Sequence, residues 1–289
     1  MKKILAVGIA TLDIVNTVEA YPKENDEIRA SSQRHCRGGN AANTLVILKQ
    51  LGNQCDWLGV LADDPSSQYI TQDFAHYGVN HQQANTYKGG KTPTSYVTLN
   101  RENGSRTIVH YRDLPEYDFE SFKKIDLSTY DWIHFEGRHI EDTARMIIHA
   151  NAHCPNTPIS VEIEKHRPGI EQLFPLPNYL IFSHDYAEKQ GAEQAEQLLS
   201  SVRQAAPDAH IVCTWGKTGA YALNVDGSLH HSIGFPPEKT VDTLGAGDTF
   251  NAGLIHALAN QSDLGSAVID ACKLAGKKCA IEGLQLPST

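Results

Sequence analysis

The sequence lacks the features that mark several common classes of protein. Its apolar runs fall well short of the roughly 20 residues that a membrane-spanning helix needs. Lysine and arginine number 25 against 34 aspartates and glutamates, which gives a formal net charge of −9 at pH 7. A chain of this charge is repelled by phosphate backbones and by anionic lipid. We therefore expect no nucleic acid and no membrane among its partners.

The sequence also lacks paired cysteines and the histidine spacings of metal sites. Its six cysteines are scattered without a Cys-x-x-Cys pair, and its 14 histidines show no His-Glu-x-x-His spacing. Scattered cysteines are typical of reduced thiols in the cytoplasm, whereas a disulfide framework or a zinc site needs cysteines at set spacings. We expect a cytoplasmic protein with neither.

Two common nucleotide-binding signatures are missing as well. Residues 216–218 read GKT, like the end of a P-loop, but Ile211 stands where that motif requires its first glycine, and a strand pattern follows instead of a helix. Residues 8–11 read GIAT and lack the Gly-x-Gly-x-x-Gly that follows the first strand of dinucleotide-binding folds. The sequence thus excludes a Walker-type nucleotide site and a Rossmann dehydrogenase.

What the sequence does contain is a regular alternation of strand and helix patterns. The chain begins with a short basic and then apolar stretch, but Asp13 interrupts it, so residues 4–9 predict a buried strand rather than a secretory signal. Strand patterns then alternate with helical ones, including helices over 186–205 and 248–259. This alternation predicts an α/β fold over 1–289, with a doubly wound, mostly parallel sheet flanked by helices.

Two stretches break that alternation. Residues 13–36 are largely polar and contain short alternating pieces, and residues 81–113 contain further alternating strand patterns. Asn103-Gly104 lies between two of these strands and is a strong signal for a hairpin turn. We expect small antiparallel excursions from the main sheet at both places.

The motif with the most chemical content is DTLGAGD, residues 242–248. Its glycines, Gly245 and Gly247, precede a helical pattern, and the free N–H groups at the start of a helix bind anions. Asp248 falls in the first turn, where a carboxylate beside an anion site suits a general base that deprotonates a hydroxyl as it attacks phosphorus. On spacing alone, a plain helix cap explains the motif equally well.

A second motif is GGNAAN, residues 38–43. The glycine pair opens a helical pattern and Asn40 suits the capping position, which leaves Asn43 unexplained in an otherwise apolar helix. Asn40 and Asn43 are three residues apart and share one helix face, where carboxamides could bind a polyhydroxylated ligand such as a sugar. Asp13 follows the first strand and is either a turn residue or a ligand contact at the carboxyl end of the sheet.

The two motifs together resemble those of the PfkB, or ribokinase-like, carbohydrate kinases. Further blocks are similar to the ketohexokinase branch of that family, namely WIHFEGR at 132–138, SVEIEK at 160–165 and AGKKC at 275–279. The resemblance covers the whole chain. It implies a ribokinase-like fold of one domain, with lid strands from 13–36 and 81–113, that transfers phosphate from ATP to the 1-hydroxyl of a ketohexose such as fructose.

The resemblance also implies the site residues. The implied catalytic residues are Asp248 and the anion-hole residues Gly245, Ala246 and Gly247. The implied substrate-binding residues are Asp13, Gly38, Gly39, Asn40, Asn43, Arg138 and Asp248. The implied ATP-binding residues are Arg106, Gly216, Lys217, Thr218, Gly219, Gly245, Gly247 and Cys279.

The family's metal-organising motif is where the sequence departs from the pattern. Many members carry Asn-x-x-Glu after a central strand, and residues 183–186 here read SHDY. The remaining candidates for organising Mg²⁺ are Glu162, Glu164 and Asp185. The resemblance implies ATP and Mg²⁺ as cofactors, with K⁺ as a further candidate, and a homodimer that pairs through the lid.

Two alternatives stay open. The same chemistry could serve another sugar, a nucleoside or a sugar phosphate, and Arg37 and Arg138 could face the phosphate of a phosphorylated substrate. A non-catalytic sugar or nucleotide sensor on the same fold is the other alternative, although the intact DTLGAGD motif argues against it.

Overall fold

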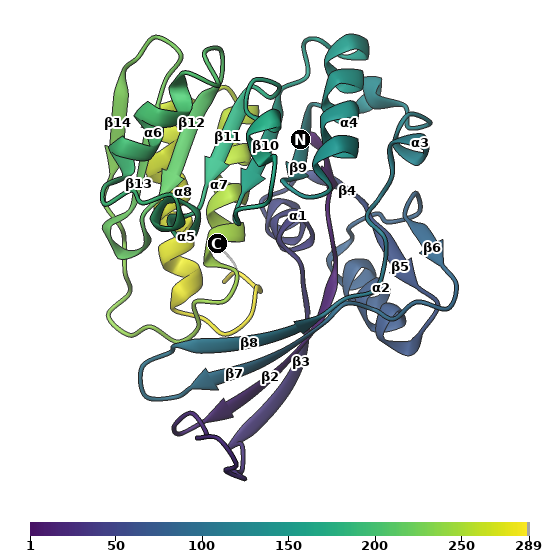
Figure 1. The fold of residues 1–289 in the computed structure, drawn as a ribbon, viewed down its shortest axis with the longest axis vertical. Coiled ribbons are helices and arrows are strands. Elements are labelled where there is room, and N and C mark those ends of the chain that lie inside the picture. The colour runs from purple at the N-terminus through teal and green to yellow at the C-terminus, as the bar shows by residue number, and fades with distance from the viewer. Residues whose placement is uncertain (288–289) are drawn as a thin grey trace.

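The computed structural model describes residues 1–287, and an eight-stranded sheet runs through it in the order β14-β13-β12-β11-β10-β9-β1-β4 (Figure 1). The strands are β1 (Lys3–Val7), β4 (Gln54–Leu58), β9 (Trp132–Glu136), β10 (Ile159–Ile163), β11 (Tyr179–Phe182), β12 (His210–Thr214), β13 (Ala220–Leu223) and β14 (Leu229–Ser232). All pairs from β4 to β12 are parallel, and the β12–β13 and β13–β14 pairs are antiparallel. The predicted doubly wound α/β fold is confirmed.

Helices cover both faces of this sheet. They are α1 (Asn40–Gln50), α2 (Pro65–Tyr77), α3 (Phe119–Phe122), α4 (Ile140–His153), α5 (His184–Lys189), α6 (Ala195–Arg203), α7 (Ala246–Ala259) and α8 (Leu264–Cys279), with short 3-10 turns η1 (Leu127–Thr129), η2 (Ile170–Leu173) and η3 (Gly216–Thr218). The apolar core that α4 and α6 form with the sheet is separate from the clusters that α1, α7 and α8 form with it. No helix within residues 1–287 is long and apolar enough to cross a bilayer.

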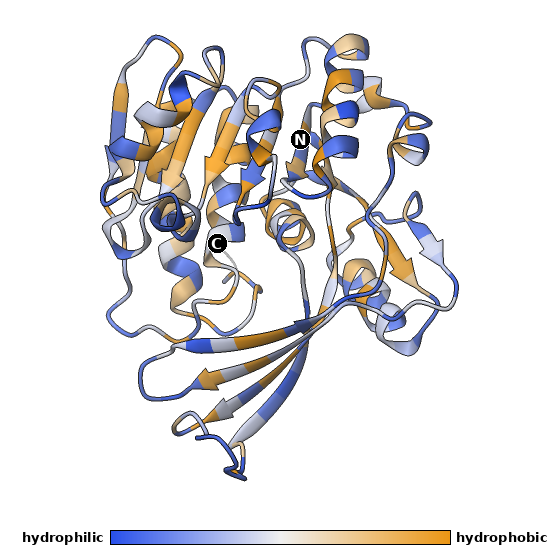
Figure 2. Cartoon of the chain, viewed as in Figure 1, coloured by the Kyte–Doolittle hydropathy of each residue, from blue (hydrophilic) through white to orange (hydrophobic). Residues whose placement is uncertain are grey.

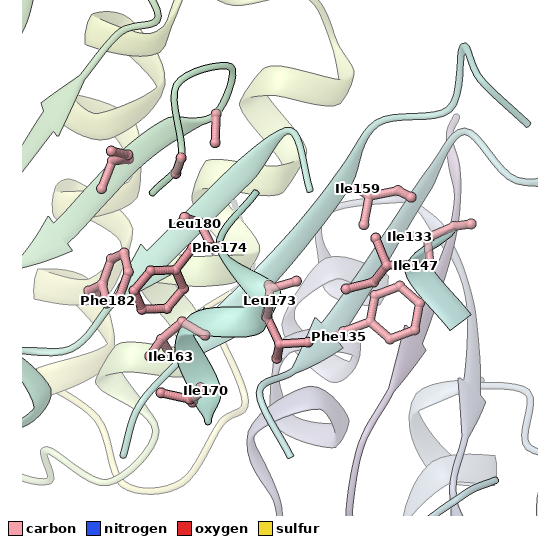
Figure 3. Close-up of a cluster of buried hydrophobic side chains, with 14 of the residues drawn as sticks. Ile133, Phe135, Ile147, Ile159, Ile163, Ile170, Leu173, Phe174, Leu180 and Phe182 are labelled. Carbon is pink, nitrogen blue, oxygen red and sulfur yellow. The ribbon is translucent and has the colours of Figure 1, made fainter. Parts of the chain in front are cut away.

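The central strands of the large sheet are buried on both faces because helices cover both faces. On β9, for example, Ile133 and Phe135 pack toward α4 (Figure 3), while Trp132 packs toward α1. All five β9 residues and all five β10 residues are buried. A strand buried on both sides shows a continuous apolar run rather than alternation, which is why these strands were readable in the sequence.

A second sheet, here called the lid sheet, projects beyond the carboxyl ends of the large sheet (Figure 1). It contains β2 (Thr11–Val18), β3 (Ser32–Gly38), β7 (Thr94–Asn100) and β8 (Arg106–Tyr111) in the order β3-β2-β7-β8. The outer pairs are antiparallel, and the central pair, β2 with β7, is parallel. A third, two-stranded sheet pairs β5 (Val60–Ala62) with β6 (Asn85–Tyr87).

Several local expectations need correction. The helix expected over 186–205 is two helices, α5 and α6, because Gly191 adopts φ +78° and stops the first. Asn40 is the first residue of α1 rather than its cap, which is Gly39. Asp13 lies inside β2, not in a turn after the first strand. The start of α1 differs from the expectation by one residue, whereas the break between α5 and α6 and the place of Asp13 inside a strand were predicted wrongly.

Candidate active site

A cavity of about 620 Å³ lies where the carboxyl ends of the large sheet meet the lid sheet and the start of α7. Fourteen of the residues expected to form the site line it, namely Asp13, Gly39, Asn40, Asn43, Arg106, Arg138, Glu162, Glu164, Asp185, Gly216, Gly245, Ala246, Gly247 and Asp248. These residues come from both sheets and from three helices. The carboxyl edge of a parallel sheet is the usual place for ligands in open α/β folds.

The start of α7 is shaped by its glycines. Gly245 caps the helix with φ +81°, a backbone conformation that is strained for any residue with a side chain. A Cβ at this position would also lie 2.7 Å from the Leu284 side chain. Gly247 faces open space, since a Cβ there would meet nothing within 4 Å. Ala246 donates its N–H to the Thr243 carbonyl at 3.2 Å. The first-turn amides that follow, at residues 247 and 248, have no carbonyl partner within a helix and lie at the cavity wall.

Asp248 is buried beside those amides. Its Oδ2 accepts a hydrogen bond from Asn43 Nδ2 at 2.6 Å, and its main-chain oxygen accepts one from the Thr44 hydroxyl at 3.3 Å. The pKa of the Asp248 carboxyl is raised to about 7, chiefly by burial and also by the nearby carboxylates of Glu164 and Glu136, against the hydrogen bond from Asn43 and the charge of Arg37. The carboxyl therefore exchanges its proton near neutral pH, as a general base requires.

The remaining sugar-binding candidates near Asp248 come from β2 and from the turn that leads into α1. Asp13 accepts a hydrogen bond from the Thr11 hydroxyl at 2.8 Å. A Cβ at Gly38 would stand 2.2 Å from Asp13 Oδ2, and one at Gly39 would stand 2.1 Å from the Ile9 carbonyl oxygen. Both glycines are thus required by close packing. Gly38 itself lies outside the cavity wall and makes room for the Asp13 carboxylate.

The lid sheet is tied to the loop before α7 by two arginines. Arg106 on β8 donates to the Thr243 hydroxyl at 3.0 Å, and Arg34 on β3 donates to Asp242 Oδ2 at 2.9 Å. Asp242 also contacts Lys278 on α8. This lysine is fully buried, and its Nζ donates a hydrogen bond to the Asp242 carbonyl oxygen at 2.7 Å. The pKa of the Asp242 carboxyl is lowered chiefly by Lys278, against its burial. The loop is therefore held from both sides.

A family model for pfkB family carbohydrate kinases matches residues 1–289. The chain belongs to this family. It is 40% identical over 290 residues to the ketohexokinase of Mus musculus, an alignment that covers 98% of this chain and 97% of that one. The predicted family and enzyme class are confirmed, and the protein is a carbohydrate kinase.

The fold of this PfkB kinase also matches solved structures. The ribokinase from Giardia lamblia superposes with a TM-score of 0.85 at 15% identity, covering 98% of this chain and 96% of that one. The ribokinase from Arabidopsis thaliana, solved with ribose and ATP, superposes with a TM-score of 0.79 at 17% identity, covering 98% and 94%. Likeness at these identities establishes the fold alone.

The acidic wall of the cavity is more elaborate in this PfkB kinase than the sequence suggested. Glu162 Oε1 accepts from Asn251 Nδ2 at 2.9 Å, while Glu162 Oε2 is buried without a partner. Glu136, which was not predicted, accepts from the Ala41 N–H at 2.8 Å and from the Ile9 N–H at 3.2 Å. Burial raises the pKa of both glutamates above the usual range. This wall of the cavity therefore contains two buried carboxyl groups, those of Glu136 and Glu162, whose pKa values are raised.

Three basic residues on the cavity wall were not predicted as site residues from the sequence. Lys165 and Arg167 follow β10, and His110 lies on the lid strand β8. Arg138 faces the same space, with its Nε 2.9 Å from Glu116 Oε1 and 3.9 Å from Glu136 Oε2. The pKa of His110 is lowered by burial and by Arg138 and Lys165. The SVEIEK block contained Lys165, but nothing in it separated a site lysine from a surface lysine.

Some predicted ATP-binding residues lie outside the cavity wall. Lys217 and Thr218 form the short turn η3 and are exposed, and only Gly216 of that turn lines the cavity. Gly219 packs against β14, where a Cβ would stand 1.9 Å from the Ser232 carbonyl oxygen. Cys279 accepts the Val241 N–H at 2.8 Å through its carbonyl oxygen, behind the loop that precedes α7. Their contact with ATP stays a prediction.

The three metal candidates also line the cavity, but they do not form a ready-made metal cage. Within residues 1–287, no group of three or more histidine, cysteine, aspartate or glutamate side chains could hold a metal ion. Mg²⁺ that arrives with a nucleotide needs only one or two carboxylates, since phosphate oxygens and water complete its shell. Glu162, Glu164 and Asp185 fit such a site, and Glu162 has an unpartnered carboxylate oxygen.

Proposed function

We propose that this PfkB kinase transfers the γ-phosphoryl group of ATP to the 1-hydroxyl of a ketohexose, with fructose as the first candidate, and that Asp248 is the general base. The observation that carries the proposal is the buried Asp248 carboxyl, held by Asn43 at the start of α7 on the cavity wall. The ketohexokinase relative at 40% identity supports the choice of substrate. The ribokinase solved with ribose and ATP supports the choice of donor.

The base acts in one concerted step. Asn43 occupies Oδ2 of Asp248, which leaves Oδ1 to accept the proton of the attacking hydroxyl. As the O–H bond breaks, the hydroxyl oxygen bonds to the γ-phosphorus, and the bond from that phosphorus to the bridging oxygen of ADP breaks. The pKa of about 7 lets Asp248 take this proton at neutral pH and release it afterwards. Asp13, Asn40 and Asn43 would hold the other hydroxyl groups of the sugar.

Charge on the transferring phosphoryl group would be met by the start of α7 and by the lid. The first-turn amides and the helix dipole favour negative charge at Gly247. Arg106 reaches the same loop through Thr243 and supplies a full positive charge. Bound Mg²⁺ neutralises the triphosphate, and Glu162, Glu164 and Asp185 are the residues that would face it. K⁺ activation is tested by replacing K⁺ with tetramethylammonium in the assay.

A phosphorylated substrate is the second candidate. Arg138, Lys165 and Arg167 line one part of the cavity, and together they could bind a second phosphate. Arg37, which the sequence also offered for this role, is occupied instead by Asp73 and Asn43, at 2.6 Å each. The glutamates near Arg138 offset much of its charge, which favours a neutral sugar. The sensor alternative gains no support, because binding a sugar without reaction does not require a buried carboxyl such as that of Asp248 at the start of α7.

We also propose that the lid sheet pairs two copies of the chain. Its strands β7 and β8 expose Tyr96, Val109 and Tyr111, at 52%, 67% and 50%. Tyr96 and Val109 stand opposite each other in the ladder, so the exposed residues form one apolar patch. A second copy that covers this patch would bury it. Sedimentation of the purified protein tests the dimer directly.

The deciding experiment measures ADP release with MgATP and each of fructose, ribose, adenosine and fructose 6-phosphate. Phosphorus NMR of the product then identifies the hydroxyl that receives the phosphate. Rapid turnover of fructose to the 1-phosphate supports the proposal. Turnover of fructose 6-phosphate instead would favour the phosphorylated substrate, with Arg138, Lys165 and Arg167 as the residues that bind its phosphate. Sugar binding without any ADP release would contradict a kinase that acts on these sugars.

A further inference from the structure

A chain of buried hydrogen bonds leads away from the proposed base. Asp248 Oδ2 accepts from Asn43 Nδ2, Asn43 Oδ1 accepts from Arg37 Nη1, and Arg37 Nε donates to Asp73 Oδ2, each at 2.6 Å. The Arg37 guanidinium also lies 5.4 Å from the centre of the Phe74 ring. The base is thus connected through two side chains to a residue on α2. Nothing in the proposed mechanism uses the outer part of this chain.

The order of donors and acceptors in this chain is fixed by Arg37. The two ends of an asparagine amide have almost the same shape, and the amide can turn over by rotating its terminal torsion. Arginine has only donors, so the end of Asn43 that faces Arg37 has to be the oxygen. The nitrogen of Asn43 must then face Asp248. Without Arg37, the ionised Asp248 carboxylate would be the remaining group that favours this orientation, and a protonated Asp248 carboxyl, which can also donate, could face either end of Asn43.

Arg37 acts from outside the cavity. Its side chain is only 2% exposed, and it does not line the 620 Å³ space in which the substrate would bind. It lines a separate cavity of about 120 Å³ behind Asn43, together with Asp73 and Tyr77. Asn43 lines both cavities, as do Asp13 and Leu244, and of these three Asn43 accepts the hydrogen bond from Arg37. Arg37 therefore contacts the site through its hydrogen bond to Asn43, and its charge also acts on Asp248 across that bond by lowering the pKa of the carboxyl.

We propose that Arg37 is a positioning residue that fixes the amide orientation of Asn43, so that Asn43 donates to the proposed base and presents a defined polar edge to the sugar. The inference rests on the proposed role of Asp248. Asp73 and Phe74 hold Arg37 in place for this task. Sugar turnover depends on this orientation, while the ATP side of the cavity does not touch Arg37.

The test is a double-mutant cycle between Arg37 and Asn43. The Arg37→Met variant is expected to lower kcat/KM for fructose by about 10- to 100-fold, the scale of a misplaced catalytic group, with KM for ATP unchanged. Arg37→Lys keeps a donor toward Asn43 and is expected to recover part of the loss. In an Asn43→Ala background, Arg37→Met should cost little more, because the amide it orients is gone.

Three further variants separate this role from general stability. Asp73→Asn weakens the hold on Arg37 and should reduce kcat/KM for fructose in the same direction by a smaller factor, which also tests the chain if Arg37→Met folds poorly. Arg203→Met is the matched control. Arg203 is a partly buried arginine that bonds main-chain carbonyls such as that of Ala209 at 2.8 Å, far from the cavity wall. It should lower the melting temperature and leave kcat/KM unchanged.

The outcomes distinguish this inference from the proposed function. If Asp248→Asn abolishes turnover while Arg37→Met and Asn43→Ala lower it additively, the role of Arg37 is wrong and the proposed function stands. If the losses in kcat/KM for fructose are additive and Arg37→Met also raises KM for ATP by a similar factor, Arg37 only maintains the fold. If Asp248→Asn retains turnover, the proposed base fails first.

Discussion

The strands of the large sheet and those of the lid sheet differ sharply in what surrounds them. On β9 all five residues are buried, whereas on β8 all six are exposed. The contrast is visible in Figure 2, where the strands of the large sheet are largely orange and those of the lid sheet mix orange with blue and white. The large sheet is covered by helices on both faces, whereas the lid sheet buries much of β2 and leaves its outer strand β8 exposed.

The difference separates two tasks in catalysis. The large sheet and α7 hold Asp248 and the helix start in a close-packed frame, which suits a base that must be placed accurately. The lid sheet brings Arg34 and Arg106 to the loop before α7 through polar contacts, with little apolar burial. Such contacts form and break at low cost, so the lid is the part suited to open for substrate and close for transfer.

The strongest test of this contrast is Asp248→Asn in the rigid part. We expect kcat to fall by about 10²–10⁴-fold or more, the scale for loss of a general base. Because burial raises the pKa of the carboxyl to about 7, ionised Asp248 costs stability at neutral pH, and the neutral amide should not lower the melting temperature. Asp270→Asn on exposed α8 is the control. Steady-state kinetics and calorimetry are the measurements, and a variant with near-normal kcat would remove Asp248 from its role.

The next effect is on stability rather than rate. Phe135→Ala in β9 leaves a cavity in a fully packed core and should lower the free energy of unfolding by about 3–5 kcal/mol. Val109→Ala in β8, measured at a protein concentration at which the chain is monomeric, removes an exposed side chain and should change the free energy of unfolding by no more than about 0.5 kcal/mol. Urea denaturation of both variants checks this, and similar losses would mean that the lid sheet is as tightly integrated as the core.

Arg106→Ala tests whether the lid contributes charge to the reaction. Losing one charge-assisted contact to phosphate should lower kcat/KM for ATP by about 10- to 100-fold. The melting temperature should stay the same, because Arg106 is exposed and bonds only the Thr243 hydroxyl. Arg101, a lid arginine paired with Glu19, provides the control through Arg101→Ala. An equal loss in both variants would point to the net charge of the lid rather than to Arg106.

The last prediction concerns the change of kcat with pH in the unmodified protein. In the proposed mechanism the ionised form of Asp248 is the active base, and the pKa of its carboxyl is raised to about 7, so kcat should rise with pH up to that value and then level off. Below it, activity should fall by about tenfold for each pH unit, since one proton is involved. Arg106→Ala should keep this profile, because Arg106 is not among the groups that shift the pKa of Asp248. A profile flat between pH 5 and pH 9 would contradict ionisation of Asp248 as the controlling step.

Much of the fold was readable because its signals are local. Apolar runs bounded by turn residues marked the strands of the large sheet, and Asn103-Gly104 marked the turn between β7 and β8. The glycines of DTLGAGD marked the start of α7 for the same reason. Where the prediction failed, as at the break between α5 and α6, one glycine in a left-handed conformation outweighed an otherwise helical pattern.

The sequence by itself determined the family, the alternating architecture and which residues carry chemistry, because motifs of glycine, asparagine and aspartate require particular backbone shapes near a ligand. Only the tertiary structure decided which of them meet. Asn43 and Asp248 are 205 residues apart, and Arg37 and Asp73 come from different elements. Such contacts depend on how elements pack, and packing is a property of the whole chain rather than of any local pattern. The orientation of Asn43 is therefore visible only in the folded protein.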